Sequence, residues 1–235
     1  MAMDEKQLAQ VQKQRAAHQH KGYVIDIPLT DGSVLKDFIV DKHILRPEIM
    51  TSVVLARYLF FNNGLYHNKA VIDMGCGSGI QSIVMGLYGA QRCVATDIYD
   101  KAVQNTAKNV LRFGLGKVVM STIGDLFETV PHERFDTIVF NHPFFHKSGG
   151  PYDALDTATV NDGGLLHSFL EDAPNYMATD GTIVMPYYHL AGPSNDPGIQ
   201  AAQHNGYIVS ERFRHEVATG LQTGLVSIYE LTHSG

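Results

Sequence analysis

Three groups of residues in this sequence have types and spacings that suit ligand binding or chemistry. The first is the glycine-rich stretch "VIDMGCGSGI", residues 71–80, which begins as an apolar run. Such a turn between a buried strand and a helix lets the backbone approach a ligand closely and points free helix N–H groups at it. The glycines are Gly75, Gly77 and Gly79, and Ile80 stands where a dinucleotide-binding turn has its third glycine. Taken alone, the pattern also fits a tight turn that binds nothing.

The second group consists of two acids at the ends of the next predicted strands. Asp97 in "ATDI" follows Gly79 by eighteen residues, and Asp125 in "GDLF" precedes Leu126. A carboxylate at the first position can accept hydrogen bonds from both hydroxyls of a ribose. A carboxylate beside an apolar side chain suits an adenine, whose amino group donates while the apolar side chain covers the ring. Each acid alone is more often a helix cap or a solvated loop residue. The glycine-rich turn and the two acids at successive strand ends together predict a nucleoside site.

The third group is "FNHPFFHKSGG", residues 140–150, directly after the apolar run "DTIVF". An asparagine, a proline and bare aromatic side chains stand at the mouth of a predicted buried strand. What they do there depends on what the rest of the chain builds around that mouth.

The elements that must position these groups alternate between strands and helices from about residue 70. Apolar strands are predicted at 69–75, 92–99, 117–125, 135–141 and 181–190, with helices between them, and two final strands at 207–217 and 225–233. This order predicts an α/β fold: a Rossmann-like, doubly wound, seven-stranded, mostly parallel sheet with an antiparallel last strand. Before it, the sequence predicts a polar helix at 4–20, a β-hairpin at 23–40, and a helix at 46–61 with Pro47 near its first turn.

The composition limits the classes of partner and compartment. The chain has 235 residues, of which 44% are hydrophobic and 18% charged, which fits one catalytic domain over 48–235 and a shorter segment over 1–47 that could act as a lid. The net charge of −6 and the lack of a Lys/Arg run argue against a nucleic-acid partner. No apolar window is long enough for a membrane span or a signal peptide, so we expect no membrane association. Two unpaired cysteines indicate the cytoplasm, and the scattered histidines predict no metal site.

With these motifs in order, the sequence resembles the class I S-adenosylmethionine-dependent methyltransferases over about residues 48–233. "DMGCGSG" resembles the first motif of that family, "ATDI" the ribose motif, "GDLF" the adenine motif, and "FNHPF" the N-P-P-F/Y motif. The resemblance implies S-adenosylmethionine as the cofactor, with Asp97 at the ribose, Asp125 at the adenine and the glycine turn beneath the methionine part. The implied cofactor-binding residues are Asp73, Gly75, Cys76, Gly77, Gly79, Asp97, Ile98, Asp125, Leu126 and Asn141.

The same resemblance gives the third group a mechanism. In relatives with N-P-P-F/Y, the asparagine oxygen and a nearby backbone carbonyl accept hydrogen bonds from the acceptor nitrogen, and the aromatic stacks over the acceptor. Positioning then carries most of the rate, because the sulfonium is already a good leaving group. The implied catalytic residues are Asn141, Pro143 and Phe144, together with His142, Tyr152 and Tyr187.

Two departures from the motif leave the acceptor open. His142 replaces a proline, either as a tolerated substitution, as part of a reshaped acceptor cradle, or as a group that takes a proton from an ammonium nucleophile. Phe145, with Tyr152, Tyr187 and Tyr188, makes the predicted mouth unusually aromatic, which would stabilise a sulfonium, although each tyrosine alone fits the core or the rim equally well.

The acidic charge favours a small-molecule acceptor, methylated on nitrogen or oxygen, over a polymer. The alternative is a cyclase in which the amino group of S-adenosylmethionine attacks its own γ-carbon, giving azetidine-2-carboxylate and methylthioadenosine. A protein that only senses the cofactor is a third hypothesis, and the N-x-P-F pattern argues against it. The sequence leaves the acceptor, the oligomeric state (a homodimer among the options) and the order of the N-terminal segment undetermined.

Overall fold

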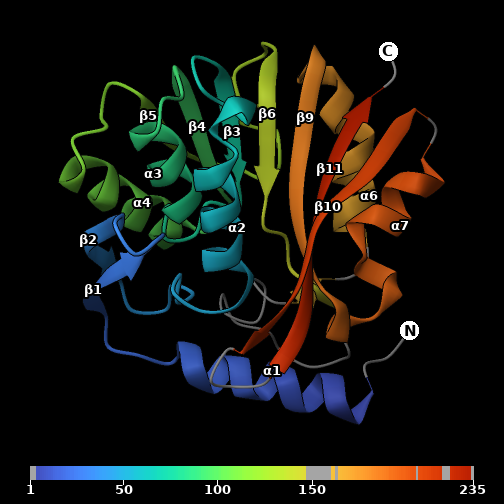
Figure 1. The fold of residues 1–235 in the computed structure, drawn as a ribbon, viewed down its shortest axis with the longest axis horizontal. Coiled ribbons are helices and arrows are strands. Elements are labelled where there is room, and N and C mark those ends of the chain that lie inside the picture. Colours follow the sequence, from blue (N-terminus) through green and yellow to red (C-terminus); the bar gives the residue numbers. More distant parts are fainter. Residues whose placement is uncertain (1–3, 147–159, 162–163, 205, 219–222, 234–235) are drawn as a thin grey trace.

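The computed structural model describes residues 4–146, 160–161, 164–204, 206–218 and 223–233, and its centre is one large sheet (Figure 1). The sheet has seven strands in the order β10-β11-β9-β6-β3-β4-β5. Neighbouring strands from β5 to β9 are parallel, and β11 is antiparallel to both β9 and β10. The prediction of a seven-stranded, mostly parallel sheet with an antiparallel strand near its end is therefore confirmed.

The elements follow one another along the chain in the predicted alternation. Their bounds are α1 Glu5–His18, β1 Tyr23–Pro28, β2 Val34–Val40, α2 Met50–Phe61, η1 Asn63–Leu65, β3 Ala70–Met74, α3 Ile80–Leu87, β4 Arg92–Asp97, α4 Asp100–Arg112, β5 Val119–Ile123, β6 Phe135–Phe140, β7 Phe145–His146, β8 Val160–Asn161, α6 Leu165–Asp172, η2 Ala173–Asn175, β9 Met177–Tyr188, η3 His189–Ala191, η4 Pro193–Asn195, α7 Pro197–Gln203, β10 Tyr207–Ala218 and β11 Thr223–His233.

The two faces of the sheet carry separate hydrophobic clusters, because successive side chains of a strand point to opposite faces. Along β3, Val71 belongs to the cluster that contains buried apolar residues of α3, of the hairpin strand β2 and of α2 from Leu55 to Leu59. Its neighbour Ile72 belongs to the other cluster, which contains Phe127 and the buried residues of α6. Both faces are thus covered, which explains why the central strands read as continuous apolar runs.

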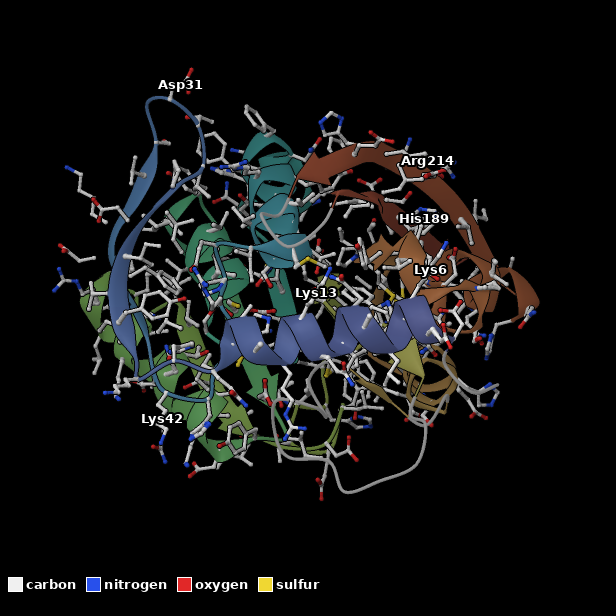
Figure 2. The ribbon with its side chains drawn as sticks, turned by 90° about the horizontal axis from the view of Figure 1, so that it is seen from below. Lys6, Lys13, Asp31, Lys42, His189 and Arg214 are labelled. Atoms are coloured by element: carbon white, nitrogen blue, oxygen red, sulfur yellow. The ribbon has the colours of Figure 1, made fainter. Side chains whose placement is uncertain are left out.

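The N-terminal part forms the predicted helix and hairpin outside the large sheet. Strands β1 and β2 pair antiparallel as a two-stranded sheet of their own. Helix α1 lies across the lower end of the sheet, toward which β6 points (Figure 1), and the same helix lies in front when that end is viewed from below (Figure 2). Parallel strands end together, so α1 covers the edge of the sheet where the predicted motifs lie.

Helix α2 differs from the prediction at its start. It begins at Met50, four residues later than expected, and Pro47 lies in the segment before it. The backbone explains the shift, since Ile49 is extended and Met50 has a φ of 57°, in the left-handed region that branched and bulky residues avoid. None of the helices in the described ranges is long and apolar enough to cross a membrane.

Candidate functional site

The glycine-rich turn connects the end of β3 to the start of α3. Gly75, Gly77 and Gly79 have φ values of 65°, 54° and 84°, which L side chains rarely adopt. Space is also short at the last of them, because a Cβ on Gly79 would lie 2.9 Å from Oγ1 of Thr106 on α4. The turn therefore requires glycine for both its conformation and its close contact with α4.

Asp97, at the end of β4, lies directly beside this turn. Its Oδ2 accepts a hydrogen bond of 2.9 Å from the backbone N–H of Gly77, and its Oδ1 accepts one of 2.9 Å from Tyr99. Burial raises the pKa of the Asp97 carboxyl, and the two backbone donors oppose that rise. Each carboxylate oxygen keeps a further lone pair. The structure thus joins two of the predicted features into one fixed unit.

Other predicted cofactor residues lie beneath the turn or away from it. Asp73 is 1% exposed and accepts hydrogen bonds from the N–H (2.9 Å) and the hydroxyl (2.5 Å) of Ser82, which connects β3 to α3. Burial raises the pKa of Asp73 to about 7. Cys76 is buried, and its Sγ accepts from the hydroxyl of Thr106. Ile98 is 62% exposed at the end of β4.

Asp125 and Leu126 follow β5 at the neighbouring strand end. The Asp125 side chain is exposed, and Leu126 has a φ of 45°, a left-handed conformation for a non-glycine residue. A cavity of about 900 Å³ begins at these two residues and continues past Arg134 and Tyr176. Neither Asp97 nor the glycine turn lines this cavity, so it lies to one side of the unit that they form.

Asn141 follows β6 and is held by the start of α2. The Thr51 hydroxyl donates to Oδ1 of Asn141 at 2.9 Å, and Nδ2 of Asn141 donates to Oγ of Ser52 at 3.0 Å. Sequence reasoning missed these two hydroxyl residues. The sequence around Thr51 and Ser52 gives little sign of this role, because Asn141 lies about ninety residues further along the chain. The residue before them, Met50, has a left-handed backbone conformation.

His142, which replaces the proline of the motif, is 1% exposed. Its Nδ1 lies 2.9 Å from the carbonyl oxygen of Pro143, which can accept a hydrogen bond when Nδ1 carries the proton. Burial lowers the pKa of His142 to about 4. The ring packs edge-on against Phe144, with 4.8 Å between the ring centroids. At neutral pH the ring is uncharged and is a weak proton acceptor.

The aromatic residues near the motif are mostly core residues. Phe145, Tyr187 and Tyr188 are all at most 1% exposed. Tyr187 packs edge-on against Phe144 and donates its hydroxyl proton to the carbonyl of Gly192. The structure therefore shows no open aromatic mouth at these three residues. Tyr152 lies outside the described residues.

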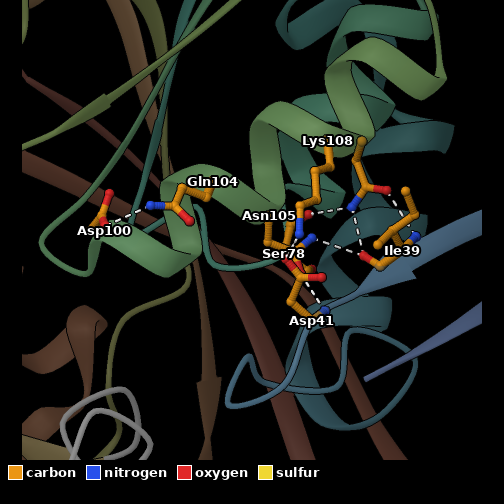
Figure 3. A network of polar contacts seen from close by, with 8 residues as sticks. Ile39, Asp41, Ser78, Asp100, Gln104, Asn105 and Lys108 are labelled. Atoms are coloured by element: carbon orange, nitrogen blue, oxygen red, sulfur yellow. Dashed lines mark hydrogen bonds and ion pairs between the residues drawn. The ribbon is translucent and has the colours of Figure 1, made fainter. Parts of the chain in front are cut away.

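The N-terminal elements attach to the carboxyl edge in two ways. On α1, Nε2 of Gln7 donates to the carbonyl oxygen of Ala191, just after β9, at 2.8 Å. The hairpin is fixed to α4 by two asparagines: Nδ2 of Asn105 and Nδ2 of Asn109 donate to the carbonyl oxygen of Ile39 at 2.9 and 2.8 Å, and Oδ1 of Asn109 accepts from its N–H at 2.9 Å (Figure 3). Asn109 also donates to the carbonyl oxygen of Ser78 at 2.9 Å, which couples the hairpin to the glycine turn.

Comparison with known proteins shows what this arrangement resembles. The family described as ribosomal protein L11 methyltransferase (PrmA) matches residues 58–142. A ribosomal protein uL3 glutamine methyltransferase of Bordetella pertussis is 29% identical over 164 residues, which are 65% of this chain and 55% of the relative. A Methanocaldococcus jannaschii protein, named as a candidate protein N5-glutamine methyltransferase, is 30% identical over 154 residues, which are 63% of this chain and 76% of the relative.

Solved structures agree with the fold. The ribosomal protein L11 methylase of Lactobacillus delbrueckii subsp. bulgaricus has a TM-score of 0.60 at 16% identity, covering 89% of this chain and 99% of that one. The chain spans about half the length of the Bordetella pertussis protein, 55% of it.

These comparisons correct two expectations from the sequence. The expectation of a small-molecule acceptor is wrong. Several relatives are named for methylating ribosomal proteins, one for a release factor and one for a tRNA. The argument from net charge against a nucleic-acid partner also fails, since charge averaged over a whole chain says little about one local surface. The cyclase alternative has no support among the relatives.

The cofactor expectation is confirmed by the methyltransferase relatives and by a structural neighbour that holds S-adenosylhomocysteine. The residues of this chain fit that group, because the positive-φ turn leaves room where side chains would stand and the fixed Asp97 carboxylate keeps free lone pairs beside it. The cofactor is S-adenosylmethionine, and the chain belongs to the class I S-adenosylmethionine-dependent methyltransferases.

Proposed function

We propose that this protein methylates the side-chain amide nitrogen of a glutamine in a protein substrate. The observation that carries the proposal is the Asn141 carboxamide, held from two sides by Thr51 and Ser52 at the carboxyl end of β6. A side-chain oxygen fixed in this way can accept a hydrogen bond from a planar N–H₂ group. Relatives named for glutamine methylation support the choice of acceptor.

For the cofactor, we propose the roles that the family motif implies. Asp97 binds the ribose hydroxyls, since its carboxylate is already oriented by the amides of Gly77 and Tyr99. The turn from Gly75 to Gly79 lies under the methionine part, and the exposed Asp125 and neighbouring Leu126 bind the adenine. Asp73 and Cys76 support the turn from below, as their burial and hydrogen bonds indicate.

S-adenosylmethionine supplies a methyl group on a positively charged sulfur, which is a good leaving group. The acceptor nitrogen bonds to the methyl carbon as the carbon–sulfur bond breaks, the electron pair stays on sulfur, and one nitrogen-bound proton passes to solvent. Asn141 aims that nitrogen, while Pro143 and Phe144 form the wall beside it. An amide nitrogen is a weak nucleophile because its lone pair is delocalised into the carbonyl, so we assign Asn141 the task of orienting that nitrogen toward the methyl group.

We also propose that α1 closes the carboxyl edge over the bound substrates, whereas the hairpin is a fixed part of the catalytic domain. Gln7 supports the first point through its contacts after β9, and the Asn105 and Asn109 contacts to Ile39 support the second. Within the segment 1–47, we therefore place the boundary between the closing helix and the catalytic domain in the stretch between α1 and β1. Substrates of the ribosomal type are found in the cytoplasm, which is the compartment we propose.

The test is a methyl-transfer assay with tritiated S-adenosylmethionine. The acceptors are recombinant ribosomal proteins uL3 and L11, a peptide-chain release factor, and total bacterial tRNA. We expect label in one of the proteins, and mass spectrometry of its peptides should place one added methyl group on a glutamine. The control is Asn141→Ala, which should keep cofactor binding and lose transfer.

Label found only in tRNA, or on a protein residue other than glutamine, would overturn the proposed acceptor. Transfer by Asn141→Ala at the wild-type rate would show that the acceptor binds elsewhere. Failure of the wild-type protein to bind S-adenosylmethionine in calorimetry would overturn the cofactor roles given above.

A further inference from the structure

Helix α1 carries a buried glutamine whose side chain has no partner. Gln10 is 1% exposed, and neither its Oε1 nor its Nε2 makes a hydrogen bond within the described part of the chain. A buried carboxamide that bonds to nothing is costly and uncommon in native proteins. An unmet donor on a buried side chain indicates a ligand that accepts a hydrogen bond from it.

The contacts of α1 place Gln10 at the carboxyl edge of the sheet. Three residues earlier, Gln7 donates to the carbonyl oxygen of Ala191, which follows β9. A helix rises about 1.5 Å per residue, so Gln10 lies about 4.5 Å further along the axis. Neighbouring strands are about 4.8 Å apart, and the strand next to β9 is β6. Helix α1 runs across the strand ends, and Gln10 lies in the sequence between Lys6 and Lys13, which are labelled on that helix (Figures 1 and 2).

Two further contacts of the helix agree with this placement. Val11, the next residue, is 8% exposed and belongs to the hydrophobic cluster that contains Met50 and Phe144. At the far end of the helix, Nδ1 of His18 accepts a hydrogen bond of 2.8 Å from the backbone N–H of Arg46, shortly before α2. Gln10 therefore lies on the part of α1 that runs from the segment after β9 toward the start of α2, and the start of α2 is also the segment that holds Asn141.

Another unmet polar atom occurs on the same side of the molecule. Among the described residues, Oδ1 of Asn195 is buried without a partner. Asn195 is attached to the motif itself, because its Nδ2 donates to the carbonyl oxygen of Phe144 at 2.9 Å. An unpaired polar atom is therefore attached to the motif through Asn195, and Gln10 on α1 carries two more.

We propose that Gln10 is a substrate-binding residue that holds the carbonyl oxygen of the acceptor glutamine. Nε2 of Gln10 donates to that oxygen, while Oδ1 of Asn141 accepts from the amide nitrogen. The inference rests on the proposed function and deepens it, because α1 becomes part of the acceptor site. Two contacts to one planar amide fix its plane, so Gln10 orients the acceptor.

This arrangement also discriminates between glutamine and glutamate. A glutamate side chain presents only acceptor oxygens at neutral pH. It can accept a hydrogen bond from Nε2 of Gln10, but it cannot donate one to Oδ1 of Asn141. A site built to bind a donor rejects an analogue that lacks it, because the site's own polar group is then left unpaired.

The test compares Gln10→Leu with Gln12→Leu, a matched change on the exposed face of the same helix. For each variant we would measure the melting temperature, the affinity for S-adenosylmethionine by calorimetry, and kcat and KM for the protein that the wild type methylates. We expect Gln10→Leu to raise KM at least tenfold, with cofactor affinity and melting temperature kept or increased. Gln12→Leu should match the wild type throughout. An unchanged KM in Gln10→Leu would overturn the proposal.

A second measurement does not depend on turnover. In the wild-type protein labelled with nitrogen-15, the side-chain N–H₂ signal of Gln10 is identified by its loss in Gln10→Leu. Titration with the tripeptide Ala-Gln-Ala in the presence of S-adenosylhomocysteine should shift that signal, and Ala-Glu-Ala should not. No shift with either peptide overturns the role of Gln10. A shift without methylation of any protein would keep Gln10 as a binding residue and overturn the proposed function instead.

Discussion

The hydroxyl of Thr51 donates a hydrogen bond of 2.9 Å to Oδ1 of Asn141, although ninety residues separate them. Ser52 accepts from the other end of the same carboxamide. In this arrangement Oδ1 of Asn141 faces Thr51 and Nδ2 faces Ser52, and the oxygen keeps one lone pair. The left-handed Met50 turns the chain so that both hydroxyl residues reach the strand end. Strain of this kind often occurs where a site needs a fixed geometry.

Thr51→Val should lower kcat with little change in cofactor affinity. The variant keeps the shape of the buried side chain and removes the donor, so the Asn141 amide can rotate away from the acceptor. The loss of one such hydrogen bond corresponds to a decrease of roughly three- to tenfold. Kinetics with the methylated protein would measure it, and Thr51→Ser should restore most of the rate. Equal activity of Thr51→Val and wild type would show that Asn141 needs no support.

Asp97→Ala and Asn141→Ala should separate cofactor binding from transfer. Asp97→Ala removes the carboxylate and leaves the N–H groups of Gly77 and Tyr99 without their acceptor. We expect the affinity for S-adenosylmethionine, measured by calorimetry, to fall at least about a hundredfold. Asn141→Ala should keep that affinity within a few-fold and lose turnover. Similar losses of binding in both variants would contradict the division of roles.

Gly79→Ala should destabilise the protein more than Gly114→Ala does. Both glycines have a left-handed backbone, with φ of 84° and 69°, which costs an alanine about 1–2 kcal/mol. A Cβ at Gly114 meets nothing within 4 Å, whereas one at Gly79 would lie 2.9 Å from Thr106. Urea unfolding would give both free energies, and the excess for Gly79→Ala measures the contact with α4. A larger loss in Gly114→Ala would contradict this account.

The buried Asp73 should make stability depend on pH in a definite direction. Burial raises its pKa from 3.8 to about 7, so between these values the folded protein holds a proton that the unfolded chain releases. The contribution of Asp73 to stability therefore falls as pH rises from about 4 to about 7 and is constant above that. The difference in melting temperature between wild type and Asp73→Asn, followed from pH 4 to pH 8, should show this slope. A difference independent of pH would mean that Asp73 is ionised in the fold throughout.

Much of the fold could be predicted because it is recorded in local patterns. Continuous apolar runs such as 135–140 identify strands buried on both faces, and the alternation with helices forces parallel connections. The glycine-rich turn could be predicted as well. Glycine adopts the left-handed conformation most readily, and Gly75, Gly77 and Gly79 all have it. The start of α2 could not, because Pro47 is a plausible first-turn residue and the extended Ile49 and left-handed Met50 that delay the helix have no local sequence signal.

The sequence by itself determined the sheet, the turn and the residue types at each strand end, because those depend on neighbours along the chain. The tertiary structure decided what surrounds them. It buried Phe145, Tyr187 and Gln10, placed Thr51 against Asn141, and put α1 over the strand ends. These contacts join segments far apart in the chain, and their energies come from burial and hydrogen bonding across that distance. No local pattern records such contacts, so they had to be seen in the folded molecule.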